Sequence, residues 1–220
     1  MPDAPHSDVP VHEEHFESLA RQSQAARFGM WVFLSSEALL FAALFALYAG
    51  YHAHWPAAFR EGVRHNDVYL GSTNTVILIV SSFFAAFAVH ALEVGRRRLA
   101  VAALFLTLVH GAAFLGLKGL EYVKHIGEGM VPGGGTPFFV EHATPGLVSF
   151  VNLYYLMTAL HALHVVVGMA ILGILAVIIA KGRMGPSHGY RLEVGVLYWH
   201  LVDAIWIFLW PMFYLMGDVQ

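Results

Sequence analysis

The sequence predicts an all-α integral membrane protein whose membrane domain is a bundle of five transmembrane helices. The 220-residue chain is 58% hydrophobic, with a mean hydropathy of +0.62, and 12% of its residues are charged. In a soluble domain about 25% of residues are charged. Five apolar runs are each long enough to cross a hydrocarbon core of about 30 Å. The chain has no cysteine, which excludes disulfides, thiolate metal sites and iron–sulfur clusters, and its net charge of −3 argues against binding to nucleic acid.

The predicted domain organisation is a polar N-terminal tail, residues 1–26, followed by the membrane domain, residues 27–220. The tail contains Pro2, Pro5 and Pro10 and a segment rich in histidine and glutamate, residues 12–17. It lacks the basic start and the apolar core of a signal peptide. We expect its histidines to be solvated, because no fixed set of partners could complete a metal site.

The five spans are predicted from apolar runs separated by polar connections. They cover about residues 28–50, 70–92, 99–120, 146–180 and 194–216. The fourth run is longer than a membrane requires, so this helix is expected to tilt or protrude. The third connection, residues 123–145, is too rich in glycine and proline to span. In the first span Ala38, Ala42 and Ala46 recur every fourth residue, a small-residue ridge suited to close helix packing in lipid.

The distribution of basic residues predicts the orientation, since cytoplasmic segments of membrane proteins are enriched in lysine and arginine. The N-terminal tail and the second and fourth connections hold eight of the twelve basic residues: Arg21, Arg27, Arg96, Arg97, Arg98, Lys181, Arg183 and Arg191. Lys118 and Lys124 lie near the third connection. An odd number of spans places the termini on opposite sides. We therefore expect a cytoplasmic N-terminus and an external C-terminus.

Glu37 is the single charged residue in the first span. At 1.5 Å per residue it lies about 14 Å into the run, close to the middle of the bilayer. An ionised carboxylate at this depth costs at least a few kcal/mol, so we expect Glu37 to be protonated or strongly hydrogen-bonded. Two interpretations are open: a functional membrane carboxyl, or a polar link between helices.

Other ionisable residues share this band of the membrane. They are His110 in the third span, His161 and His164 in the fourth, and His200 and Asp203 in the fifth. Because buried charges need partners, these side chains are expected to face the bundle interior or a cleft rather than lipid. Three further residues, His90, His188 and Glu193, are placed at the cytoplasmic edge of the predicted spans.

Three chemistries could use such a band. Histidines with a carboxylate suit iron or copper, but di-iron bundles need Glu-x-x-His pairs on two helices and further glutamates, so we assign no metal ligand and no catalytic residue. Acid and histidine chains also form proton relays, and the same residues could simply hold helices and lipid head groups together. A stand-alone membrane di-iron enzyme and a proton-coupled transporter remain alternatives, although transporters usually show internal repeats or broken helices.

The motifs of the spans, taken in order, resemble one family, subunit III of the haem–copper respiratory oxidases. The resemblance runs from Arg27 to Gly217 and rests on Gly29-Met30-Trp31 with Ser36-Glu37, Asn74-Thr75, Ser81-Ser82, His90-Ala91-Leu92, Glu121-Tyr122, His161-Ala162-Leu163-His164-Val165 with Gly168, His188, Glu193, and Tyr198 to Trp206.

This resemblance implies a helical core subunit without redox centres of its own, bound to catalytic subunit I, which holds the haems and copper, and to subunit II. Such a subunit is expected to stabilise the catalytic subunit, to bind phospholipid and to support proton uptake. Glu37 corresponds to the membrane carboxyl of the family. His161, His164, His200 and Asp203 correspond to its helix-facing polar residues.

The complex implied is a cytochrome c oxidase of a bacterial cytoplasmic membrane, which reduces oxygen to water and pumps protons. A quinol oxidase is the near alternative, and a subunit associated with nitric oxide reductase is a third. Many members of the family have seven spans, and the two N-terminal ones have no counterpart in this sequence. Either a small subunit supplies additional helices, or the lipid cleft beside them is more open.

Overall fold

The computed structural model describes residues 19–141, 144 and 146–217, and every regular element in these residues is helical, which confirms the all-α prediction. The elements are α1 (Leu19–His54), α2 (Pro56–Arg64), α3 (Val68–Glu93), α4 (Arg97–Gly127), α5 (Pro137–Glu141), α6 (Leu147–Ala180), the short 3-10 helix η1 (Pro186–His188) and α7 (Gly189–Tyr214). Most of the predicted polar tail, residues 1–18, lies outside the described residues.

Five of these helices, α1, α3, α4, α6 and α7, are long and apolar enough to cross a membrane, with mean hydropathies from 1.5 to 2.8. They coincide with the five predicted spans, and the chain is therefore a multi-pass membrane protein. Several helices extend beyond the predicted runs, α1 and α4 by the most. α1 begins at Leu19, inside the segment predicted as tail, and α4 continues to Gly127. Lys118 lies within α4, as predicted, and Glu121, which follows the predicted end of the third span at about residue 120, lies within it too.

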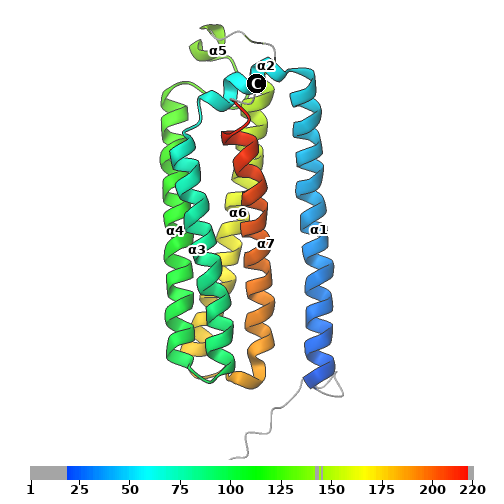
Figure 1. Cartoon of the computed structure of the whole chain (residues 1–220), viewed down its shortest axis with the longest axis vertical. Helices are drawn as coiled ribbons and strands as arrows, with labels where there is room; N and C mark the ends of the chain where they lie inside the picture. The colour runs from blue at the N-terminus through cyan, green and yellow to red at the C-terminus, as the bar shows by residue number, and fades with distance from the viewer. Residues whose placement is uncertain (1–18, 142–143, 145, 218–220) are drawn as a thin grey trace, which may run out of the picture.

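Helices α3, α4, α6 and α7 form the body of the bundle, and α1 lies at one side of it against α7 and α6 (Figure 1). The connections α3–α4 and α6–α7 lie at the end where α1 begins, which we call the turn end. Helices α2 and α5 lie at the opposite end, which we call the α2 end (Figure 1). The ridge of Ala38, Ala42 and Ala46 is exposed on the outside of α1 rather than packed within the bundle.

Glycines allow α4 and α6 to approach α7 closely. A Cβ atom added to Gly111 of α4 would lie 2.9 Å from Cη2 of Trp199, and one added to Gly168 of α6 would lie 2.8 Å from Cε3 of the same indole. Trp199 is fully buried between these helices, and its Nε1 donates to Oγ of Ser81 on α3 at 3.1 Å. Close backbone approach at small residues is the usual packing mode in lipid.

The α2 end is held by side chains that bond the last carbonyl groups of α7. The Tyr48 hydroxyl donates to the carbonyl of Met212 at 2.7 Å, and Nδ2 of Asn66 donates to the carbonyl of Phe213 at 2.8 Å. Carbonyl groups at the end of a helix have no partner within it. Tyr48 from α1 and Asn66 from the α2–α3 connection supply those partners, and so fix α7 against both segments.

Candidate functional site

Glu37 and His164 form a polar pair between α1 and α6. Nε2 of His164 lies 2.9 Å from Oε2 of Glu37, and the two side chains are 12% and 20% exposed. The hydrogen bond expected for Glu37 is therefore present, and its partner comes from the predicted band. The sequence placed both residues in the membrane, but it did not pair them.

The proton content of the pair follows from the second nitrogen of the imidazole. Nδ1 of His164 lies 2.8 Å from the carbonyl oxygen of Leu160, and a carbonyl can only accept a hydrogen bond, so Nδ1 carries a proton. The contact with Glu37 then contains one further proton. It is either an imidazolium with a carboxylate or a neutral imidazole with a carboxylic acid, and in both states the net charge is zero. This neutrality makes the pair tolerable in a membrane.

Aromatic rings enclose the pair. The ring of Phe41 meets the His164 imidazole edge-on, with centroids 5.3 Å apart. Tyr198 of α7 donates its hydroxyl to the carbonyl of His164 at 3.3 Å, and its ring stacks on Phe33 of α1 at 6.0 Å. The pair therefore lies where α1, α6 and α7 meet.

The structure does not bring the rest of the predicted band together as one site. His161 is fully buried between the rings of Phe114 and Trp206, at 5.5 Å and 5.2 Å, and neither of its nitrogens has a hydrogen-bond partner among the described residues. Asp203 is 5% exposed and lies near Ser82, and its oxygens also lack hydrogen-bond partners within the described part of the chain.

The remaining two histidines of the band lie in different surroundings. Nδ1 of His200 lies 2.6 Å from Oγ of Ser82, which links α7 to α3. His110 is half-buried against Phe84, and its Nδ1 lies 2.8 Å from the carbonyl oxygen of Leu106 in its own helix. Among the residues that the structure describes, no three histidine, aspartate or glutamate side chains are grouped as a metal ion would require.

The predicted edge residues lie at the turn end. Nη2 of Arg27 is 2.6 Å from Oε2 of Glu193, an exposed ion pair between α1 and α7. His90 is exposed in the last turn of α3, and His188 precedes α7 with its Nδ1 3.1 Å from Oγ of Ser187.

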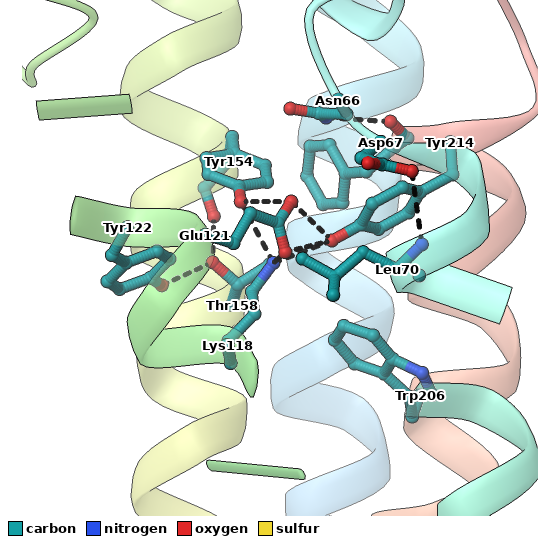
Figure 2. A network of polar contacts seen from close by, with 12 residues as sticks. Asn66, Asp67, Leu70, Lys118, Glu121, Tyr122, Tyr154, Thr158, Trp206 and Tyr214 are labelled. Carbon is teal, nitrogen blue, oxygen red and sulfur yellow. Dashed lines mark hydrogen bonds and ion pairs between the residues drawn. The ribbon is translucent and has the colours of Figure 1, made fainter. Parts of the chain in front are cut away.

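A second polar centre, which the sequence analysis missed, lies inside the bundle near the α2 end (Figure 2). Nζ of Lys118 lies 3.1 Å from Oε2 of Glu121, and their side chains are 3% and 2% exposed. The same ammonium group donates to the hydroxyls of Tyr154 and Tyr214 at 2.9 Å and 2.8 Å. Tyr154 donates to Oε1 of Glu121 at 2.9 Å, and Tyr214 lies 2.7 Å from Oε1 and 2.8 Å from Oε2.

Every donor of this cluster has an acceptor. The three N–H groups of the Lys118 ammonium group donate to one carboxylate oxygen and two hydroxyls. Each of these hydroxyls in turn donates a hydrogen bond to Glu121. The ring of Tyr154 lies 4.5 Å from Nζ, and the ring of Trp206 lies 5.4 Å from it. Such full pairing is the condition under which a buried ion pair is tolerated, and the cluster joins α4, α6 and α7.

One signal in the sequence could have revealed this cluster. Lys118 and Glu121 are three residues apart, which puts them on the same face of a helix if the third span continues beyond residue 120. The predicted end of the span at about residue 120 falls between the two residues. Tyr154 and Tyr214, by contrast, come from other helices, and nothing in the local sequence marks them as partners.

Comparison with known proteins identifies the family. Residues 11–218 match the family model of cytochrome c oxidase subunit III. Quinol oxidase subunit 3 of Bacillus spizizenii is 31% identical over 216 residues, which cover 94% of this chain and 97% of that protein. Cytochrome c oxidase subunit 3 of Lycodon semicarinatus is 30% identical over 87% of this chain and 70% of its own length, and that of Gallus gallus is 29% identical with the same coverage.

The resemblance noted in the sequence is confirmed, because the match extends from the predicted tail to the end of α7. The relative named as a quinol oxidase subunit and the relatives named as cytochrome c oxidase subunits match this chain at similar identity. The chain belongs to the cytochrome c oxidase subunit III family, and is thus a subunit III of the haem–copper oxidase type.

Proposed function

We propose that this chain is a non-catalytic core subunit of a haem–copper terminal oxidase in a bacterial cytoplasmic membrane, with its N-terminus on the cytoplasmic side. Its partners are catalytic subunit I, which holds the haems and copper, and subunit II. The match over residues 11–218 carries this proposal. The geometry supports it, since Glu37, His164, Lys118 and Glu121 are engaged in contacts between helices.

The complex is proposed to be a cytochrome c oxidase, which couples the reduction of oxygen to water with proton pumping. A quinol oxidase is the second candidate. One observation favours it: the Bacillus spizizenii relative, named a quinol oxidase subunit, matches along 97% of its length, whereas the Lycodon semicarinatus cytochrome c oxidase subunit matches along 70%.

The Glu37–His164 pair is the proposed site of proton supply or lipid retention. It contains one mobile proton, and with 20% exposure Glu37 is reachable from outside the bundle. A proton relay needs a group that can gain and lose a proton without leaving a buried net charge. The pair meets that need if one of its two residues accepts a proton while the other releases one.

Phospholipid is proposed to bind beside α1. A groove of about 300 Å³ runs between α1 and α7, lined mainly by apolar side chains: Trp31, Leu34, Ser35, Ala38, Leu197, His200 and Leu201. This lining suits an acyl chain. The exposed ridge of Ala38, Ala42 and Ala46 on α1 borders this groove at Ala38. The rest of the ridge suits close packing of a partner helix, and we propose a small additional subunit there.

A deletion strain tests the function. Membranes that lack this chain should consume oxygen with reduced cytochrome c more slowly, or lose that activity sooner during turnover, and the intact gene should restore it. Loss of quinol-driven but not cytochrome c-driven respiration would select the quinol oxidase. Unchanged respiration with both donors would contradict the proposal.

A further inference from the structure

The α3–α4 connection places three arginines side by side at the turn end. Helix α3 ends at Glu93, and Gly95 follows it with φ +75. The N–H of Gly95 donates to the carbonyl of Leu92 at 3.0 Å, and the N–H of Arg96 donates to the carbonyl of Ala91 at 2.8 Å. This is the usual way in which a glycine ends a helix. Because α4 begins at once with Arg97, the arginines have no room to spread along a loop.

Arg96, Arg97 and Arg98 line a pocket of about 490 Å³, together with Gly95 and Leu99. All three side chains are exposed, and within the described part of the chain none of them makes a hydrogen bond or an ion pair. The pocket is therefore a concave surface with three unneutralised guanidinium groups.

The neighbouring α6–α7 connection increases this positive charge. A Cβ atom on Gly182 would lie 2.8 Å from Nη1 of Arg97, so the two connections are in contact there. Lys181 and Arg183 flank that glycine and are exposed. Glu93, the acidic residue at the end of α3, does not line the pocket. Its side chain lies beside Gly189 at the start of α7.

The surface beside the arginines is apolar. Val94 is 54% exposed and Leu99 is 42% exposed, and Leu99 itself lines the pocket. At the end of a membrane-spanning helix, basic groups lie at the depth of lipid phosphates, and exposed leucine just below them lies at the depth of acyl chains. A soluble anion would contact the arginines only, whereas a lipid would contact both the arginines and the apolar side chains beside them.

We propose that this pocket binds the phosphate head group of an anionic phospholipid, with its acyl chains along Leu99. Guanidinium groups bind phosphate through two parallel hydrogen bonds. This site lies at the α3–α4 turn, away from the α1–α7 groove. It deepens the phospholipid part of the proposed function, but it does not depend on the electron donor or on the catalytic partner.

The test uses the full chain, purified in mild detergent with the partners it retains and then delipidated. Phosphatidylglycerol and phosphatidylcholine with identical acyl chains are titrated separately, and bound lipid is counted by native mass spectrometry. The site predicts at least one retained phosphatidylglycerol and weaker retention of phosphatidylcholine. Replacing Arg96, Arg97 and Arg98 by glutamine should weaken phosphatidylglycerol binding by about fivefold per arginine, and by on the order of 100-fold together.

The matched control removes the same charge from the other end of the bundle. Arg60, Arg64 and Lys124 are exposed near the α2 end, and their replacement by glutamine should leave phosphatidylglycerol retention unchanged. An equal loss in this control would mean that net charge alone decides binding, and would overturn the site. Equal affinity for both lipids would overturn it as well.

Two further arms separate other occupants of the pocket. If millimolar inorganic phosphate displaces phosphatidylglycerol completely, the pocket is a simple anion site and the lipid assignment is wrong. If removing residues 1–18, which carry Asp3, Asp8, Glu13, Glu14 and Glu17, is required before phosphatidylglycerol binds, the acidic tail is the occupant and the proposal fails. A chain purified without haem would contradict the proposed function, yet its lipid binding could still be measured.

Discussion

His164 and Glu37 are 127 residues apart in the sequence, yet Nε2 of His164 lies 2.9 Å from Oε2 of Glu37. Along α1 the pair lies between two other polar contacts that attach this helix to the bundle. Arg27 and Glu193 pair at the turn end, and Tyr48 bonds the carbonyl of Met212 at the α2 end. Because much of α1 is exposed, these contacts and a narrow apolar stripe hold it in place.

Replacing Glu37 by alanine should leave the complex assembled but shorten its sustained turnover or reduce its retained lipid. The substitution leaves Nε2 of His164 without its partner, which costs about 1–3 kcal/mol for a buried group. Activity is followed through many turnovers, with lipid phosphorus measured on the same sample.

Glu37→Gln is the matched control, since its amide can still donate to Nε2 but cannot release a proton. If proton supply is the role, glutamine should behave as alanine does. If the role is structural, glutamine should restore turnover. Unchanged turnover and unchanged lipid in the alanine variant would refute any role for Glu37.

Removing one partner of the buried ion pair should destabilise the protein more than removing both. Lys118→Met leaves the Glu121 carboxylate without its cation, and breaking a buried pair in this way costs about 3–5 kcal/mol. The double variant Lys118→Met/Glu121→Leu should recover much of that loss. Thermal unfolding in detergent measures all three proteins.

Lys124→Met in the same helix provides the comparison, because Lys124 is exposed and its replacement should change stability little. The single variant Glu121→Leu completes the cycle. A double variant whose loss of stability equals the sum of the losses in Lys118→Met and Glu121→Leu would show that the two charges do not depend on each other, contrary to the observed geometry.

His161→Ala and His164→Ala should leave the haem and copper content of the purified complex unchanged. His164 bonds Glu37 and Leu160, and His161 packs between Phe114 and Trp206. Metal analysis and the reduced-minus-oxidised spectrum check this. Loss of either metal from a complex that still assembles would make one of these histidines a ligand.

Gly168→Ala should destabilise the packing of α6 against α7, by about 1–3 kcal/mol, because the added methyl group would lie 2.8 Å from the Trp199 ring. Gly173→Ala in the same helix is the control: its methyl group would meet Leu108 at 3.8 Å, an ordinary contact. The control should be neutral or stabilising, since alanine favours helix over glycine by about 1 kcal/mol. Equal melting temperatures for the two variants would contradict the close approach.

The number and positions of the spans could be predicted because hydropathy and length decide which segments cross a membrane. The ends could not be predicted as well. The third span was predicted to end at about residue 120, although α4 continues to Gly127 and buries Lys118 and Glu121. A buried cation is stable inside a helix once a carboxylate and two hydroxyls surround it. Those hydroxyls come from α6 and α7, so the stabilising contacts are not visible in the local sequence.

The sequence could predict which ionisable residues lie at one depth of the membrane, but not which of them pair. Depth follows from counting residues, and this placed Glu37 and His164 within the membrane. Which side chains meet depends on how each helix is rotated, and the sequence does not give that. The difference is clear between His161 and His110, since one is fully buried and the other is half-buried at the side of the bundle.

The most direct test of the central claim is purification through a tag on this chain in mild detergent, followed by a reduced-minus-oxidised spectrum and an iron and copper assay. Haem and copper that arrive together with a larger partner are the predicted result. Haem with non-haem iron and no copper would instead indicate a complex of the nitric oxide reductase type. A chain that arrives alone with stoichiometric iron would contradict the account, because the histidine band would then be an active site.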